Sequence, residues 1–459
     1  MTISRIVASA SLATIALAGT LSAASGPLDT HFGVGGVAII STAPGPGPDF
    51  QNGLAVQRDG KILVGGESDL GDEGGFRWRI TRLDKKGKPD PSFGSGGTVL
   101  TNMSNVGGFD ERLIALTVQR DGKIVAVGYI LTAPDVQNSA LARYNPDGSP
   151  DTSFGNGGVV VTDVASEPDH DFINQVTTDS MGRIVVAGGC RSVFVGRYLS
   201  NGTLDASFNA AGPRPGLSLT ELAASGETNS EILGMALDDE ERIVGAAYST
   251  FFDGISFHVD SAIVRFLPAG TLDGSFNPTG PRPGVVIHEL SPGFDVFFRV
   301  ALDKQGRILG AGDAFVGVGA GGFDVSLVRF LSDGRLDDAF GTGGVVLTNL
   351  GPGDSDDDAQ GVAVQPDGHI VLAGSAAPTA FTFDSDFAVA RFQSDGSLDE
   401  SFGDGGIAIT PTAPGTADDE IFAAAFQTPS KLIASGECDQ LATGRDACVV
   451  RYKLGGNDD

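Results

Sequence analysis

The sequence predicts an all-β protein, a seven-bladed β-propeller with four antiparallel strands in each blade. A turn phrase, "AVQRDGKILVGG" at 55–66, occurs in seven related copies, and a second phrase, in which Asp stands three residues before Phe, also occurs seven times. The 67 glycines in 459 residues are roughly double the usual share and mark turns. Four short strands in a repeated unit of about sixty residues are typical of a propeller.

The turn phrase predicts the first two strands of each unit. A Gln or Asp ends one apolar run, and four positions later Lys, Arg or His opens a run of Ile, Val and Leu. A short polar turn between two such runs is typical of a β-hairpin. Runs before an Arg, such as "ALARY", predict a third strand, and runs after the Phe, such as "GVVVT", a fourth. A parallel β-helix is the alternative, but its rungs are normally much shorter and lack repeated hairpin turns.

The second phrase predicts an ion pair in each unit. An Arg stands eleven residues before six of the seven Phe residues and eight before the preceding Asp, across one hairpin turn. A catalytic pair is needed once, so a pair repeated in every blade indicates a structural brace. The residues are Arg82, Arg143, Arg197, Arg265, Arg329 and Arg391, with Asp90, Asp151, Asp205, Asp273, Asp337 and Asp399; Arg451 is a seventh Arg with no such Asp or Phe after it.

The residues "VQRDGKILVGG … ITRLDKKGKPDPSFGSGG" resemble the bacterial delta-60 repeat and, more distantly, the NHL propeller repeats. The resemblance extends over essentially all of the chain after its N-terminal leader and implies a propeller fold, but no settled activity. It also implies that the run ending in "AVQ" is the innermost strand, "KILVGG" the second, "ITRL" the third and "GTVLT" the outermost. Two copies, "SFNAAGPRPG" and "SFNPTGPRPG", depart from the pattern.

This register predicts how the ring closes. The first complete four-strand set runs from Phe50 to about Thr101, which leaves the N-terminal "GVAII" as an outermost strand without a blade. The C-terminal runs "IFAAAFQ", "KLIASGE" and "CVVRYK" are three inner strands without an outer one. We expect the N-terminal strand to complete the last blade and so to remove an open sheet edge.

The N-terminus and the composition indicate an exported acidic protein. Residues 1–24 combine a basic residue, an apolar run and small residues at Ser22 and Ala24, as in a secretory signal peptide, so 25–459 should form one secreted or periplasmic propeller. The formal charge of −28 argues against nucleic-acid and anionic membrane partners and fits a cationic or neutral one. The alternative is that the charge serves solubility alone.

Loop lengths predict which face binds. Arg183 and Arg197 are 14 residues apart, whereas Arg242 and Arg265, at the matching positions, are 23 apart, so the connections between second and third strands vary. Variable loops on a rigid framework often carry binding. The candidate ligand-binding residues there are Phe251, Phe252, Phe257, Phe381 and Phe383, unless they pack beneath their own loops.

The sequence contains no recognisable catalytic constellation. The five His residues have no metal-ligand spacing, and no H-E-x-x-H, G-x-S-x-G or P-loop motif is present. We therefore expect a monomeric binding scaffold whose partner is a protein or a surface polymer, without a bound cofactor. A metal-dependent hydrolase or lyase with a cation in the central channel is the alternative.

One set of residues supports that alternative. Counting eight residues back from the end of each innermost strand gives six carboxylates and one Ser: Asp49, Glu111, Asp171, Ser230, Asp295, Asp357 and Asp419. If ring symmetry brings the carboxylates together around the axis, their oxygens suit Ca²⁺ or Mg²⁺. The other interpretation is that each side chain caps its own loop.

The three cysteines fit an oxidising compartment. Cys438 and Cys448 flank one loop of the last blade, and we expect a disulfide between them. Cys190 matches Cys438 in repeat position and has no evident partner, so we expect a free, partly buried thiol.

Overall fold

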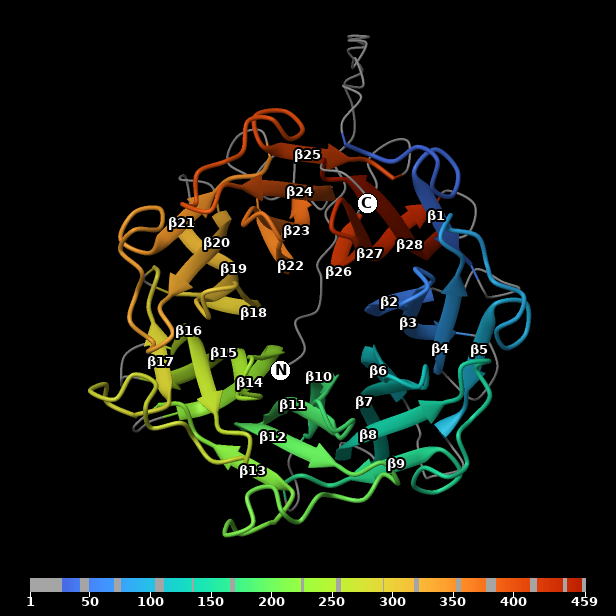
Figure 1. Cartoon of the computed structure of the whole chain (residues 1–459), viewed down its shortest axis with the longest axis horizontal. Coiled ribbons are helices and arrows are strands. Elements are labelled where there is room, and N and C mark those ends of the chain that lie inside the picture. The colour runs from blue at the N-terminus through green and yellow to red at the C-terminus, as the bar shows by residue number, and fades with distance from the viewer. Residues whose placement is uncertain are drawn as a thin grey trace, which may run out of the picture.

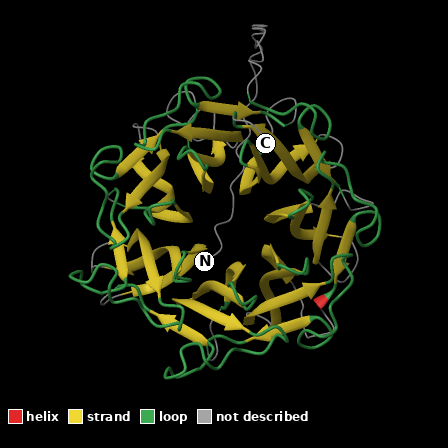
Figure 2. Cartoon of the chain, in the orientation of Figure 1, coloured by secondary structure: helices red, strands yellow, loops and turns green. Residues whose placement is uncertain are grey.

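A computed structural model describes residues 27–41, 49–69, 76–103, 111–133, 136–165, 170–223, 227–252, 257–291, 293–317, 322–351, 356–376, 385–412, 419–440 and 444–455. The predicted signal peptide lies outside these residues. The described part of the chain consists of β-strands joined by turns and loops, apart from one 3₁₀ position at Met103, and it contains no α-helix (Figure 2). All strand pairs within the sheets are antiparallel, so the predicted all-β class is confirmed.

The strands form four-stranded sets in which each strand pairs with the next one along the chain, and the sets stand radially around one axis (Figure 1). The first two are β2 (Asp49–Val56), β3 (Ile62–Asp69), β4 (Phe76–Leu83) and β5 (Thr98–Thr101), then β6 (Glu111–Val118), β7 (Ile124–Ala133), β8 (Val136–Tyr144) and β9 (Val159–Thr162). The predicted set from Phe50 to about Thr101 is therefore correct.

An eight-stranded sheet follows in the ring. It consists of β10 (Phe172–Thr178), β11 (Ile184–Cys190), β12 (Ser192–Tyr198) and β13 (Leu217–Thr220), then β14 (Glu227–Leu237), β15 (Ile243–Phe252), β16 (Phe257–Phe266) and β17 (Val285–His288). Between β11 and β14 a single residue pair, Gly189 with Glu231, joins the two halves. Strands β13 and β17 follow the two divergent phrases, and both still pair normally, because Asn209 and Asn277 adopt the positive φ that Gly adopts in other copies.

Three further sets complete the ring. They are β18 (Asp295–Leu302), β19 (Ile308–Gly317), β20 (Gly322–Phe330) and β21 (Val345–Thr348); β22 (Asp357–Val364), β23 (Ile370–Ala376), β24 (Asp386–Phe392) and β25 (Ile407–Thr410); and β26 (Glu420–Thr428), β27 (Lys431–Gln440) and β28 (Gly444–Lys453) with β1 (Val37–Ile40). The innermost strands contact one another in order, and β26 contacts β2, so the ring is closed.

The N-terminal strand completes the last set, as the sequence predicts. Strand β1 pairs with β28 from Val37 opposite Val450 to Ile40 opposite Ala447. Two backbone hydrogen bonds extend this seam, from Asp29 N to Arg451 O (2.8 Å) and from Lys453 N to Pro27 O (2.6 Å). Both ends of the described chain are thereby held in one sheet.

Each innermost strand contains a β-bulge at the same place. The pairing shifts between Gln51 and Gly53 in β2, and equivalent shifts occur in β6, β10, β14, β18, β22 and β26. A bulge leaves one residue out of the ladder and bends the strand. This bend explains the second Gly of the "GG" phrase, because a Cβ on Gly66 would lie 1.9 Å from Phe50 O.

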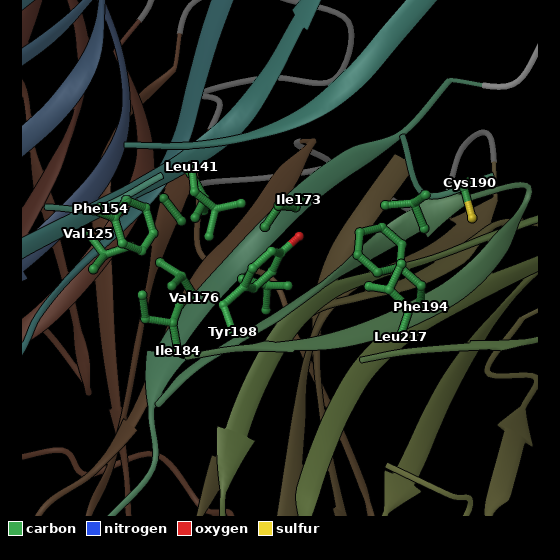
Figure 3. Packing of buried hydrophobic residues seen from close by; sticks show 14 residues of the cluster. Val125, Leu141, Phe154, Ile173, Val176, Ile184, Cys190, Phe194, Tyr198 and Leu217 are labelled. Carbon is green, nitrogen blue, oxygen red and sulfur yellow. The ribbon is translucent and has the colours of Figure 1, made fainter. Parts of the chain in front are cut away.

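The core consists of apolar clusters between neighbouring sets. Figure 3 shows one, in which Val125, Leu141 and Phe154 from one set face Ile173 and Tyr198 from the next. These side chains are at most 1% exposed. Burial of apolar surface between neighbouring sets therefore stabilises the ring, while hydrogen bonds hold each sheet.

Candidate binding face and surrounding residues

The predicted Arg–Asp pairs are present and join neighbouring sets on the face that carries the short turns. Arg143 Nε donates to Asp151 Oδ2 (2.7 Å), and its Nη1 donates to Ser200 O in the next set (2.6 Å). The guanidinium lies 4.5 Å from the centre of the Phe154 ring. The other predicted pairs, at 2.7–2.8 Å, are Arg82–Asp90, Arg197–Asp205, Arg265–Asp273, Arg329–Asp337 and Arg391–Asp399.

The seventh Arg finds its partners at the opposite end of the chain. Arg451 Nε donates to Asp29 Oδ2 (2.9 Å), and its guanidinium lies 4.8 Å from the centre of the Phe32 ring. The phrase that breaks off after Arg451 is therefore completed by the N-terminal segment.

A second cation stabilises several of these carboxylates. Lys61 Nζ lies 2.8 Å from Asp90 Oδ2, and Lys123 Nζ is equally close to Asp151. The hydrogen bond from Lys61 is the main cause that holds the pKa of Asp90 well below its usual range. The charged groups of this face are thus used in holding the turns together.

Five of the six carboxylates predicted to form a channel ring cap their own connections instead. Asp295 accepts hydrogen bonds from Leu290 N (2.7 Å), Ser291 N (2.8 Å) and Ser291 Oγ (2.7 Å), just before β18. Glu111, Asp171, Asp357 and Asp419 likewise accept from backbone N–H groups of the chain segment that follows the preceding outer strand. Asp49 accepts from the Ser68 hydroxyl of its own set.

This geometry corrects the predicted cation ring. Within the described ranges, which include all six carboxylates, no three His, Cys, Asp or Glu side chains are placed to hold a metal ion together. The physical reason is that all six carboxylates are buried, and five of them accept hydrogen bonds from backbone N–H groups of their own connections while Asp49 accepts one from Ser68. Burial raises the pKa of Asp171 to about 6, although two backbone N–H groups oppose the shift.

Buried polar groups that the sequence did not reveal link the inner strands. Asp313 on β19 accepts from Ala359 N in the bulge of β22 (3.0 Å), and Ser375 accepts from Ile421 N in the next bulge (3.0 Å). Glu437 accepts from Gln51 N (3.3 Å), which joins the last set to the first. Asp313, Ser375 and Glu437 share one repeat position, directly after the "GG" pair of the turn phrase. This shared position is the only sequence signal for the links, and Tyr or Gly occupies it in other copies.

A further link between inner strands, made by Arg299, was not predicted from the sequence. Its Nη1 donates to Leu233 O on β14 (3.1 Å) and its Nη2 to Phe422 O on β26 (2.9 Å), so it connects β18 with two other innermost strands. Burial lowers its pKa to about 10, although the nearby Asp358 carboxylate opposes the shift. Arg299 therefore acts as a strut between inner strands.

The opposite face carries connections of unequal length. Arg191 alone joins β11 to β12, residues 253–256 join β15 to β16, and residues 377–385 join β23 to β24. The connections from first to second strands in the first six sets each have five residues, as at 57–61. The predicted contrast between a uniform and a variable face is present.

The three predicted Phe residues that the structure describes lie at strand ends rather than in loops. Phe251 stacks on His258 across the β15–β16 hairpin, with ring centres 4.9 Å apart. Phe252 and Phe257 face each other at the same distance and are 45% and 66% exposed. Phe381 and Phe383 lie outside the described residues.

The neighbouring hairpin adds aromatic residues that the sequence analysis missed. Phe294, between β17 and β18, packs edge-on against Phe323 (5.5 Å), which in turn contacts Phe315 (5.3 Å). Phe294 also forms a bridge with Val259 beside the β15–β16 hairpin. Their positions follow from connection lengths specific to these two sets, which no repeat alignment supplies.

The expected disulfide is present between Cys438 and Cys448, whose Cα atoms are 5.9 Å apart. The two residues lie within β27 and β28, not at the ends of a loop, since Cys438 pairs with Asp446 and Cys448 with Gly436. Cys190 is buried outside this disulfide, and its thiol donates to Ser192 O (3.6 Å).

Comparisons with known proteins agree with the fold. A family model described as "Domain of unknown function (DUF5122) beta-propeller" matches residues 57–93, 119–154, 306–340 and 365–402. No curated protein matches the chain. No helix among the described residues is long and apolar enough to cross a membrane.

Solved structures with similar architecture were also found. A protein of unknown function from Dyadobacter fermentans is 10% identical, with a TM-score of 0.46 over 91% of this chain and 98% of that one. The β-propeller domain of the trilobed protease from Pyrococcus furiosus is 11% identical, with a TM-score of 0.41 over 90% and 98%. An endo-arabinase from Bacteroides thetaiotaomicron is 9% identical, with a TM-score of 0.33 over 63% and 96%. Scores this low support no conclusion about function. The strand topology and the family match together identify the chain as a β-propeller built from repeats similar to that family.

Proposed function

We propose that the protein is an exported seven-bladed β-propeller that binds a protein or a surface polymer through its variable face. Each four-stranded set is counted as one blade, and β10–β13 and β14–β17 are counted separately because one residue pair joins them. We also propose that the repeats are delta-60 repeats, on the phrases quoted above.

The contrast between the two faces supports a binding role. On the turn face, each described Arg of the repeated phrase has a carboxylate, a carbonyl and a Phe ring as partners, as Arg329 has in Asp337, Ser394 and Phe340. On the other face the connections differ in length, and Phe252 and Phe257 expose large apolar surfaces. A rigid framework that presents unlike loops suits recognition.

Export is supported by the leader sequence of residues 1–24 and by the Cys438–Cys448 disulfide, which suits an oxidising compartment. N-terminal sequencing of protein recovered from the periplasm and from the medium tests this part of the proposal. The mature chain should begin near Ser25. Recovery of the uncleaved chain from the cytoplasm alone would contradict export.

Crosslinking tests the binding face. The purified protein is crosslinked to its host's envelope fraction, and the contact sites are mapped by mass spectrometry. The sites should fall on the hairpins that join second to third strands, such as β15–β16. Contacts confined to the short turns, such as 57–61, would place binding on the uniform face and would contradict the proposal. Hydrolysis of a glycoside or ester panel that depends on an added divalent cation would instead favour the enzyme alternative.

A further inference from the structure

An aromatic strip lies across the variable ends of two neighbouring sets, β14–β17 and β18–β21. It consists of Phe251, Phe252, Phe257, Phe294, Phe315 and Phe323. The Val259–Phe294 bridge and the hydrogen bond from Val259 N to Gly293 O (3.2 Å) hold its two halves side by side. Phe294 is 40% exposed, in addition to the exposed Phe252 and Phe257. Three large exposed rings so close together are unusual on a surface that has no partner.

The strip has a strongly one-sided charge environment. Its segments, residues 243–264, 285–298 and 308–328, contain no Lys or Arg, whereas they contain several carboxylates. Glu289 is exposed, and its charge adds to the burial that raises the pKa of Asp260 to about 6. Asp356 is also exposed and accepts a hydrogen bond from Phe323 N (3.1 Å). The three segments that carry the rings therefore place carboxylates beside the apolar surface and contribute no Lys or Arg to it.

We infer that the aromatic strip is a docking site for a basic segment of a partner protein, in which Arg or Lys alternates with apolar residues. This inference rests on the proposed binding function. Cationic side chains gain from the faces of Phe rings and from the carboxylates beside them, while apolar side chains cover the exposed ring surface. An acidic polymer would be repelled by Glu289 and Asp356, and by the net charge of −28.

A labelled synthetic peptide with alternating Arg and Trp is the probe, and binding is followed by fluorescence anisotropy on the full mature protein. The double variant Phe252→Ser with Phe257→Ser should weaken binding about tenfold or more, as expected for aromatic anchors. Glu289→Gln with Asp356→Asn should weaken it less and should reduce its dependence on salt. Leu347→Ser is the matched control, since Leu347 is 42% exposed on the outer strand β21, and it should change nothing.

Peptides in which Glu or Ser replaces Arg distinguish charge-dependent binding from nonspecific hydrophobic binding. Both should bind far more weakly than the Arg peptide. Equal binding of the three peptides, or a Kd for the Arg peptide that the Phe variant leaves unchanged, would overturn the inference. Failure of the Arg peptide alongside crosslinks elsewhere on the variable face would reject this site but retain the proposed function. Crosslinks confined to the short turns would reject both. Thermal unfolding of the variants at the wild-type temperature confirms that the fold is intact.

Discussion

At the scale of single residues, the Arg of the repeated phrase combines three interactions that usually require separate groups. The Arg329 guanidinium pairs with Asp337, donates to a carbonyl of the next set and lies 4.3 Å from the centre of the Phe340 ring. Only a planar cation with several donors can do all three at once. This requirement explains why six full copies of the phrase, and the seventh split between the ends, use Arg and never Lys.

Arg329→Lys should therefore lower the free energy of unfolding by about 2–4 kcal/mol, near the range for a broken buried pair. Urea denaturation measures the change. Arg335 and Asp333 form the control pair at 2.9 Å, because their side chains are 74% and 45% exposed. Arg335→Lys should cost less than about 1 kcal/mol. Equal losses at the two sites would contradict the structural role assigned to Arg329.

Glu67 predicts a specific pH dependence. Burial is the main cause that raises its pKa from 4.5 to about 8, so folding favours the protonated form. The folded protein binds one more proton than the unfolded chain between these values, and stability falls as pH rises through this window. Glu67→Gln should remove that part of the fall, so the variant should lose less stability than the wild type between pH 5 and pH 8. Parallel stability curves for the two proteins would refute this account.

The residue scale also shows what the sequence could and could not predict. The constant Arg–Asp spacing predicted the brace correctly, because one turn geometry serves each copy. The buried links at Asp313, Ser375 and Glu437 were not predicted, since their repeat position also holds Tyr or Gly and their partners are bulge N–H groups in the next set. Which donor lies opposite depends on how sets pack, and single-sequence patterns do not contain that information.

At the scale of elements, five of the connections from an outer strand to the next inner strand are capped by a buried carboxylate. Asp357→Asn should lower the free energy of unfolding by about 1–3 kcal/mol, because an amide is a poorer acceptor for the Leu350 N–H. The loss should be the same with Ca²⁺ or with a chelator. A melting temperature that rises with Ca²⁺ in the wild type but not in the variant would restore the cation-site hypothesis.

The disulfide acts on one hairpin. Replacing both Cys438 and Cys448 by Ser should lower the free energy of unfolding by about 2–3 kcal/mol for so short a closed loop. The same loss should follow reduction of the wild type, measured by thermal unfolding. Cys190→Ala is the control, because this variant keeps the disulfide and should still respond to reductant. A wild type indifferent to reductant would show that the bridge adds no stability.

At the scale of the whole molecule, the seam between β1 and β28 decides whether the ring is closed. Deletion of residues 36–41 removes β1 and exposes the edge of β28, which should lower the melting temperature and promote aggregation. Removal of residues 456–459 is the control, since these residues follow the seam, and it should have little effect. Light scattering during a thermal scan measures both outcomes. Unchanged unfolding after loss of β1 would contradict the closure.

The predicted strand order and closure were correct because repeats translate directly into sheet order. The aromatic strip was only half predicted, through Phe251, Phe252 and Phe257, because Phe294, Phe315 and Phe323 reach it through connections that no other set shares. Regular features of a repeat protein can be read from its periodicity, whereas the aromatic strip proposed as a binding site lies where that periodicity fails.

The brace shared by Arg451, Asp29 and Phe32 also constrains biosynthesis. A ribosome makes Asp29 422 residues before Arg451, so the six other braces can form before the seventh is complete. A prematurely terminated chain lacks β28, which leaves both β1 and β27 with an unpaired edge. Chaperones and proteases can recognise the two exposed strand edges of such a chain, and both edges are covered only when β28 is present.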